Sequence, residues 1–174
     1  MDQHLEHNKR TQEDKILTKT MINNYAKNDL LPPPVKKKYS KDHLILLIVI
    51  YYLKSILSIN DIQTLIEPLK RRFYGAEDKL DLSRIYETLY QLQEESLEPV
   101  KEDITKRYER AMQTFDDPDI TDEEQKKMRL FSFITLLSYD VYVKKLLIEK
   151  ILDNMTEHED KPDNKKEKKT KDKK

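Results

Sequence analysis

The sequence predicts an all-α fold, and three observations lead to this prediction. The chain has 174 residues but a single glycine, Gly75, whereas phosphate-binding α/β folds and turn-rich β folds need several. Apolar residues recur at spacings of three and four along most of the chain, which is the period of a helix with one packed face. Hydrophobic residues make up 37% and charged residues 38% of the chain, which indicates a charge-rich globular protein rather than a disordered one.

The central element is an apolar run over residues 43–53, which has no polar face. A helix that is apolar on every side lies in a core or in a bilayer, and this run is shorter than the about 20 residues that cross a membrane. Lysines also flank the run on both sides. We therefore expect it to be the central helix of a small soluble core, with Ser40 as its N-cap and Asp42 near the positive end of its dipole.

The segment before this run predicts a short helix over residues 19–27, with Thr18 as its N-cap. Tyr25 lies on the apolar face of that helix and is expected to pack in the core. The helix should end at Asn28 and Asp29, after which the chain returns to the core through the pair at 30–31.

A proline-rich and basic segment leads from this helix into the central run. The three prolines at 32–34 predict a rigid extended segment, and residues 35–39 predict a short strand or wing. Seven lysines lie between residues 15 and 41, against a single acidic residue, Asp29. This local excess of positive charge indicates more about partners than the formal net charge of zero does.

The chain after the central run predicts further helices. The first covers residues 61–66, with Ser58 or Asn60 as its cap and with Pro68 as a kink or early stop. Gly75 marks a loop. Residues 80–115 predict two helices, with Pro99 in the first turn of the second.

A long helix is expected to begin at the capping box formed by Thr121 and Glu124. Its apolar pattern continues to Met155, so at about 1.5 Å per residue it would be roughly 50 Å long. A small core needs less than this, and we expect part of the helix to contact a second subunit. Seven tyrosines are expected to be core or interface residues: Tyr51, Tyr52, Tyr86, Tyr90, Tyr108, Tyr139 and Tyr142.

The sequence gives no sign of catalysis, and we expect the protein not to be an enzyme and to hold no cofactor or metal. The absence of cysteine excludes disulfides, thiolate metal sites and a cysteine nucleophile. No nucleophile, base and orienting group recur together, and no phosphate loop occurs. His4 and His7 lie one helical turn apart without a third ligand, so they are expected to be solvated surface residues. With neither a signal peptide nor a transmembrane run, the expected location is the cytoplasm, away from the membrane.

The run from Ile22 to Pro32 resembles the second helix and turn of the winged helix-turn-helix in MerR-type regulators. Five of its residues match the MerR pattern: Tyr25, Lys27, Leu30, Leu31 and Pro32. Tyr39 resembles the tyrosine that closes the wing in those proteins. Further matches to the third helix and its continuation are Leu47, Val49, Ile50, Ser58, Ile59 and Ile62. This resemblance implies a MerR-like helix-turn-helix fold and DNA binding.

A more specific resemblance covers about residues 15–70. The stretch 17–25, together with Leu-Leu-Pro-Pro-Pro at 30–34 and Lys-Lys-Tyr at 37–39, is similar to a bacterial domain-of-unknown-function family (number 1836) that is itself MerR-like. We therefore divide the chain into a MerR-like domain over residues 1–70, a helical bundle or dimerisation region over 71–156 and a disordered lysine-rich tail over 157–174.

The resemblance implies a DNA-binding surface on the helix 19–27 and the basic segment after it. Asn23 and Asn24 would pair with adenine edges in the major groove, while the lysines would contact phosphates. The candidate residues are Lys19, Thr20, Asn23, Asn24, Lys27, Lys36, Lys37, Lys38, Tyr39 and Lys41. The plainer interpretation is a solvated lysine face around a triple-proline segment.

Two functional hypotheses follow from these patterns. The first is a MerR-like transcriptional regulator that binds double-stranded DNA as a homodimer, since helix-turn-helix proteins commonly read two half-sites by two-fold symmetry. The alternative is a helical protein-interaction module that keeps the fold and does not bind DNA. Neither the operator nor a small-molecule effector is identified by any residue pattern.

Overall fold

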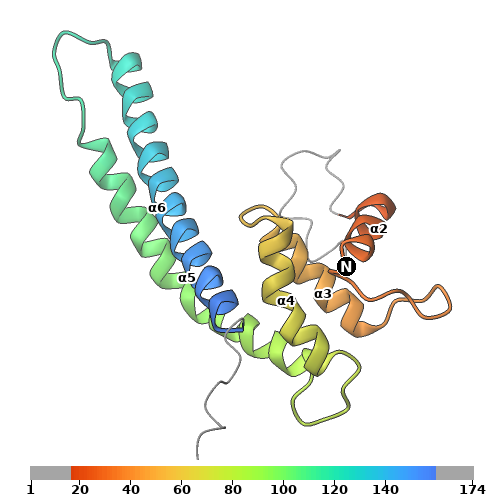
Figure 1. Cartoon of the computed structure of the whole chain (residues 1–174). Coiled ribbons are helices and arrows are strands. Elements are labelled where there is room, and N and C mark those ends of the chain that lie inside the picture. Colours follow the sequence, from red (N-terminus) through yellow and green to blue (C-terminus); the bar gives the residue numbers. More distant parts are fainter. Residues whose placement is uncertain (1–16, 160–174) are drawn as a thin grey trace, which may run out of the picture.

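The computed structural model describes residues 17–159, and helices dominate this range (Figure 1). In chain order they are α2 (Lys19–Lys27), α3 (Lys41–Leu53), α4 (Ile59–Phe73), α5 (Leu82–Met112) and α6 (Asp122–Glu159). Within the described range the only β pairing is an isolated bridge between Val35 and Lys38. The predicted all-α class is confirmed for this part of the chain.

Helix α3 is the central helix of the N-terminal core, as predicted. Its buried side chains meet the pair Leu30 and Leu31, which are fully buried where the chain returns from α2. The expectation that α3 is covered on every side is wrong, because Leu44 is 41% and Tyr52 is 50% exposed. The elements around α3 cover only part of its circumference, so an apolar residue on the remaining part stays in contact with solvent.

The start of α3 is tied to the end of α4 by buried and half-buried polar groups. Ser40 is the N-cap, and its backbone N–H donates to Nδ1 of His43 at 2.9 Å, which completes a capping box. His43 is buried, and the Tyr74 hydroxyl lies 3.0 Å from its Nε2. The N–H of Gly75 donates to the Asp42 carboxylate at 2.8 Å. Asp42 and His43 at the start of α3 therefore contact Gly75 and Tyr74 at the end of α4, and these contacts hold the two helices together.

Helix α4 is longer than the sequence pattern predicts. Ser58 is its N-cap and forms a capping box with Asp61, so one of the two expected caps is confirmed. The expected early stop at Pro68 is wrong, because the helix continues through it to Phe73. Gly75 then adopts a φ of +69°, which glycine adopts without steric cost, and the loop predicted there is confirmed.

Helix α5 corrects the prediction of two helices over residues 80–115. It is a single helix of 31 residues that runs through Pro99. Proline removes one backbone hydrogen bond and crowds the preceding turn, but its neighbours in a long helix keep their own bonds. Because Pro99 lies in an exposed stretch, no packed neighbour adds to the free-energy cost of the lost hydrogen bond and the crowding.

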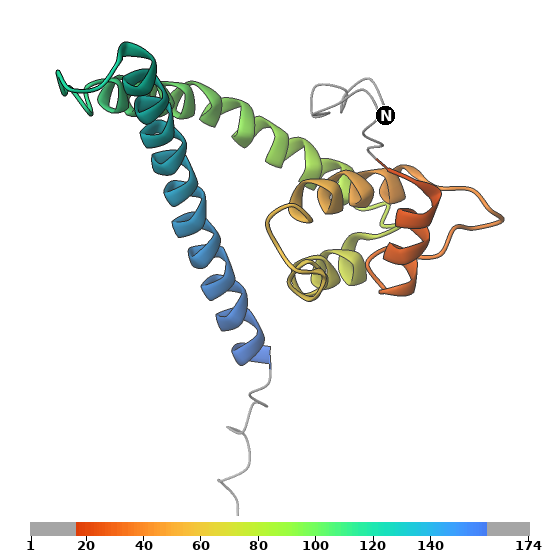
Figure 2. The same ribbon diagram turned by 90° about the horizontal axis from the view of Figure 1, so that it is seen from above.

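Helices α5 and α6 form a hairpin that leaves the core and returns to it (Figure 1). The capping box predicted at the start of α6 is confirmed, because the N–H of Thr121 donates to the Glu124 carboxylate at 2.9 Å and the N–H of Glu124 donates to the Thr121 hydroxyl at 3.3 Å. Leu82 at the start of α5 and Leu152 near the end of α6 are both buried in the N-terminal core cluster. Seen from above, the two helices diverge from their connecting loop, and the core lies at the open end (Figure 2).

The end of α6 and the boundary at residue 70 differ from the predicted division of the chain. Helix α6 continues to Glu159, three residues into the predicted tail. Residues 160–174 lie outside the described residues, as do His4 and His7. The predicted domain boundary at residue 70 falls inside α4. No helix between residues 17 and 159 combines the length and the hydropathy that a membrane span requires.

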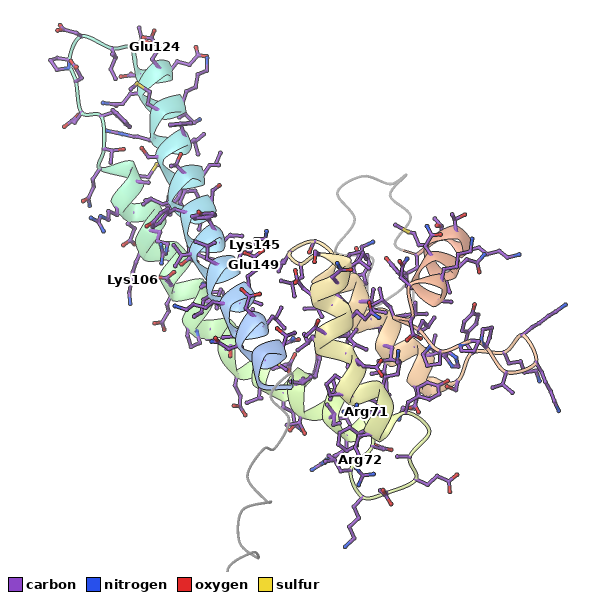
Figure 3. All side chains as sticks on the ribbon, in the orientation of Figure 1. Arg71, Arg72, Lys106, Glu124, Lys145 and Glu149 are labelled. Atoms are coloured by element: carbon purple, nitrogen blue, oxygen red, sulfur yellow. The ribbon has the colours of Figure 1, made fainter. Side chains whose placement is uncertain are left out.

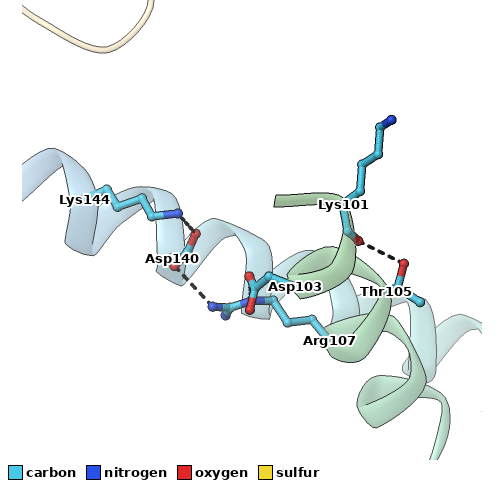
Figure 4. Close-up of polar contacts among 6 residues, drawn as sticks. All are labelled: Lys101, Asp103, Thr105, Arg107, Asp140 and Lys144. Atoms are coloured by element: carbon cyan, nitrogen blue, oxygen red, sulfur yellow. Dashed lines mark hydrogen bonds and ion pairs between the residues drawn. The ribbon is translucent and has the colours of Figure 1, made fainter. Parts of the chain in front are cut away.

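Near the loop, charged side chains join the two helices of the hairpin (Figure 4). Arg107 on α5 pairs with Asp103 one turn away and, at 3.4 Å, with Asp140 on α6. Asp140 also accepts a hydrogen bond from Lys144 at 2.7 Å. The Lys144 ammonium, followed by Arg107, lowers the pKa of Asp140 below its ordinary value of 3.8.

This lowered pKa predicts an acid-sensitive contribution to the stability of the hairpin. A depressed pKa in the folded state stabilises the fold above the ordinary pKa, and the contribution disappears as the pH falls through the folded value. Asp140→Asn should therefore lower the melting temperature at pH 7, and the difference from wild type should shrink progressively as the pH falls below the ordinary pKa of 3.8. Thermal unfolding followed by circular dichroism measures this. Asp153→Asn is the control, since that side chain makes no ion pair with a described residue. A difference that is constant with pH would contradict the assignment.

Candidate nucleic-acid interface

Helix α2 has the bounds that the sequence predicts, and it carries one packed and one exposed face. Thr18 caps it, since the N–H of Met21 donates to the Thr18 hydroxyl at 3.1 Å. Tyr25 is buried on the packed face, as predicted, and burial raises the pKa of its hydroxyl. Five candidate residues are exposed on the opposite face: Lys19, Thr20, Asn23, Asn24 and Lys27.

The two asparagines on this face keep their side-chain amides available. Among the described residues, no hydrogen bond engages the side-chain amide of Asn23 or Asn24. The backbone carbonyl of Asn24 accepts a bond from the Asn28 side chain at 2.8 Å, which closes the end of the helix. An exposed amide without an internal partner offers one donor and one acceptor group together, which is the pattern that an adenine edge complements.

The basic segment after the prolines forms a two-residue hairpin turn. The N–H of Lys38 donates to the Val35 carbonyl at 2.9 Å, and the two residues form the isolated β-bridge. The central residues Lys36 and Lys37 have φ values of 50° and 64°. Positive φ at both central positions is the type I′ geometry, for which asparagine and glycine are usual and lysine is strained. The predicted strand or wing is therefore a minimal one, with two lysines at its tip.

Tyr39 and the prolines hold the turn at its base. The Tyr39 ring meets the His43 ring edge-on, with centroids 5.3 Å apart, although the tyrosine remains exposed. His43 is itself fixed by Ser40 and Tyr74, so the turn returns to a rigid point of the core. The fixed φ of proline at 32–34 limits the flexibility of the other strand of the turn.

The candidate lysines are exposed and unpaired within the described part of the chain. No ion pair with a described residue involves any of the following: Lys19, Lys27, Lys36, Lys37, Lys38 and Lys41. Elsewhere many lysines do pair, as Lys144 does with Asp140. Unpaired cations that are close together produce a positive potential, which attracts a polyanion.

Lys70 on α4 contacts the one acidic residue of the basic segment, a contact that the sequence pattern does not predict. The Lys70 ammonium donates to the Asp29 carbonyl at 2.5 Å and lies 3.4 Å from its carboxylate. Asp29 is the single acid in the basic segment, and Lys70 is shared between it and Glu67, whose carboxylate lies closer, at 2.7 Å. The two residues are 41 positions apart, and no local pattern connects them.

Helix α2 and the basic turn lie at the same end of the molecule. In Figures 1 and 2 both are on the side of the core opposite the α5–α6 hairpin. Figure 3 places Arg71 and Arg72 at the end of α4, away from α2, so these two cations do not extend the surface. Among the described residues, no group of histidines and carboxylates is arranged to hold a metal ion.

The comparisons with known proteins concern the part of the chain that contains this surface. A family model described as a domain of unknown function, DUF1836, matches residues 1–90. No curated protein and no solved structure matches the chain. The match includes α2, the basic turn, α3 and α4, and it ends inside α5.

The strained turn gives a prediction that separates backbone geometry from charge. The double change Lys36→Asn with Lys37→Gly supplies the residues that a type I′ turn favours, so it should stabilise the fold by about 0.5–1 kcal/mol. Urea unfolding measures the gain. The control is Lys38→Asn, at a position of the same turn without positive φ, and it should give no gain. Equal stability of the double variant and wild type would show that the turn is unstrained.

Proposed function

From the premise that the chain belongs to the DUF1836 family, we propose that it binds double-stranded DNA as a MerR-like transcriptional regulator. The observation that carries the proposal is the surface just described, on which the amides of Asn23 and Asn24 and the lysine ammonium groups lack internal partners. A regulator of this kind needs side chains for base edges and for phosphates on one face. The proposal assigns no catalytic role to the chain.

The dimensions of α2 suit the major groove. Its 9 residues give a length of about 13 Å, close to the width of the groove at about 12 Å. Asn23 and Asn24 lie in the middle of its exposed face and would read adenine edges. Lys19 and Lys27 lie at its two ends, where they would contact phosphates on either side of the groove.

The basic turn would act as a small wing. Lys36 and Lys37 lie at its tip, where the ammonium groups would reach the phosphate backbone next to the groove that α2 enters. The order of a helix, an extended proline segment, a basic turn and a central helix follows the resemblance to MerR-type proteins. Backbone strain at Lys36 and Lys37 is tolerated if it places their ammonium groups for contact with phosphates.

A protein-interaction module without DNA binding is the second candidate, and one observation favours it. Many large apolar side chains on α5 and α6 are exposed, among them Phe131 at 69% and Tyr139 at 67%. Such residues are typical of surfaces that bind proteins. The two candidates differ in what α2 does, so the decisive experiment measures DNA binding and its dependence on residues of α2.

The first test uses fluorescence anisotropy with sites selected from a random duplex pool, between 50 and 200 mM salt. We expect binding that weakens steeply with salt. Lys37→Gly, which keeps the turn geometry, should weaken binding to every sequence and reduce the slope of log K against log salt by about one. Lys126→Gln on the hairpin is the matched control and should leave the slope unchanged. No binding at the lowest salt would favour the interaction module.

The second test addresses sequence reading by α2. Asn23→Ala should cost about 1–3 kcal/mol on the selected site and relax the preference at one base pair, while binding to random duplex stays as in wild type. Asn28→Ala, at the cap of the same helix, is the control for a general loss of helix structure. Should Asn23→Ala keep the selected sequence preference, α2 is not the element that reads bases.

A further inference from the structure

The two helices of the hairpin pair closely only near their connecting loop. There the rings of Tyr108 and Phe133 meet edge-on with centroids 5.3 Å apart, and Ala111 is fully buried. The Arg107–Asp140 pair lies in the same contact. This part of the hairpin shows which face of α5 fits which face of α6.

The same face of α5 continues away from the loop without a partner. From Tyr108, steps of three and four lead to Ile104, Val100, Leu97 and, further on, Leu89, which are 40–50% exposed. Every residue from 87 to 106 is exposed. An open apolar groove of about 340 Å³ lies along this stretch, lined by Leu89, Leu92, Gln93, Ser96, Leu97 and Val100.

Helix α6 shows the matching pattern. The face that carries Asp140 continues through Val143, Leu147 and Ile151, which are 44–58% exposed. Together with the α5 residues 89–104, these side chains form two unpaired apolar seams. Each seam has the periodicity of the half that is already packed near the loop.

The hairpin cannot close these seams on itself while the core is intact. Leu82 holds the start of α5 in the core cluster, where α5 contacts α3, and Leu152 holds the end of α6 there, where α6 contacts α4. The core therefore keeps the two helices apart at their open end, as Figure 2 shows. Closing the gap would expose leucines that are now 2% and 4% exposed.

The apolar area exposed over all faces of α5 and α6 is large. Five aromatic residues and more than ten aliphatic ones on α5 and α6 are each about half exposed. With 150–250 Å² for an aromatic side chain, this amounts to on the order of 1,500 Å². The largest apolar patch on a typical monomer is about 300–600 Å², and a standard interface takes about 800 Å² from each partner. The two seams contribute part of this area, and a standard interface would cover them.

The charges beside the two seams are complementary. Residues 87–98 of α5 include four glutamates and no basic residue. Beside the α6 seam, Lys144 is paired with Asp140 and Lys145 with Glu149, which leaves Lys150 without an ion pair to a described residue and a net positive charge. Figure 3 shows Lys145 and Glu149 on the part of α6 nearest the core. An α6 helix placed along the exposed α5 seam would bring opposite charges together.

We propose that the partner of this surface is a second copy of the chain. Helix α6 of each copy packs along the exposed α5 seam of the other, related by a two-fold axis, and the two hairpins form a four-helix assembly. The seam that each α5 offers is the one that α6 already fits near the loop. This inference does not depend on DNA binding, because it concerns surfaces on the opposite side of the core.

The test measures the mass of the full chain in solution by light scattering and sedimentation between 1 and 100 µM. Wild type should be a dimer. Val100→Glu and Leu147→Glu each place an unpaired charge in a seam and should weaken the dimer by about 100-fold, while circular dichroism remains that of wild type. Leu44→Glu, an exposed apolar residue on α3, is the control and should remain dimeric. A monomer at all concentrations, or dimers unaffected by both seam variants, would overturn the proposal.

A cross-link identifies the pairing and does not rely on disruptive variants. The chain has no cysteine, so Leu97→Cys and Leu147→Cys each introduce the only thiol. Mixing the two variants under mild oxidation should give a disulfide-linked heterodimer in excess of either homodimer. Preferential homodimers of one variant would show a different pairing of the helices. An intramolecular disulfide in the double variant, without any dimer, would show that the hairpin closes on itself.

Discussion

The structure depends on the junction between the start of α3 and the end of α4. Within it, His43 is buried and is joined to Ser40 and Tyr74, while Asp42 accepts from the backbone of Gly75. A buried polar group is tolerated only with its partners in place, so this junction determines how the two helices lie. The basic turn returns to it through Tyr39, and α5 follows shortly after Gly75. The candidate interface and the hairpin are thus positioned by one small set of hydrogen bonds.

Features with local causes could be predicted from the sequence. The bounds of α2 follow from Thr18 and from the turn at Asn28, and the start of α6 follows from the Thr121–Glu124 box. The burial of Leu30 and Leu31 follows from an apolar pair between polar neighbours. In each case the same few adjacent residues form the sequence pattern that predicts the feature and make the contacts that produce it. The continuous helix through Pro99 was missed because proline is a strong local signal, while the length of the helix on both sides outweighs it.

Features with distant causes could not be predicted in this way. Lys70 contacts Asp29 across a large separation in the chain. The positive φ values of Lys36 and Lys37 are not predictable because lysine carries no turn signal, and the geometry comes from the bridge that encloses the two residues. Likewise, the spacing of Val100 and Leu147 identifies an apolar face, but periodicity does not say which element covers it. The unpaired seams became visible only with the arrangement of all helices.

The position of Leu152 has a consequence for how the protein is made. This residue closes the N-terminal core, yet it is separated from α4 by the whole hairpin. During synthesis, α2, α3 and α4 emerge from the ribosome well before the leucine that completes their packing. The nascent N-terminal part therefore exposes an unfinished apolar site until α6 arrives. Attainment of the native core, and with it the basic surface, therefore waits for the synthesis of α6.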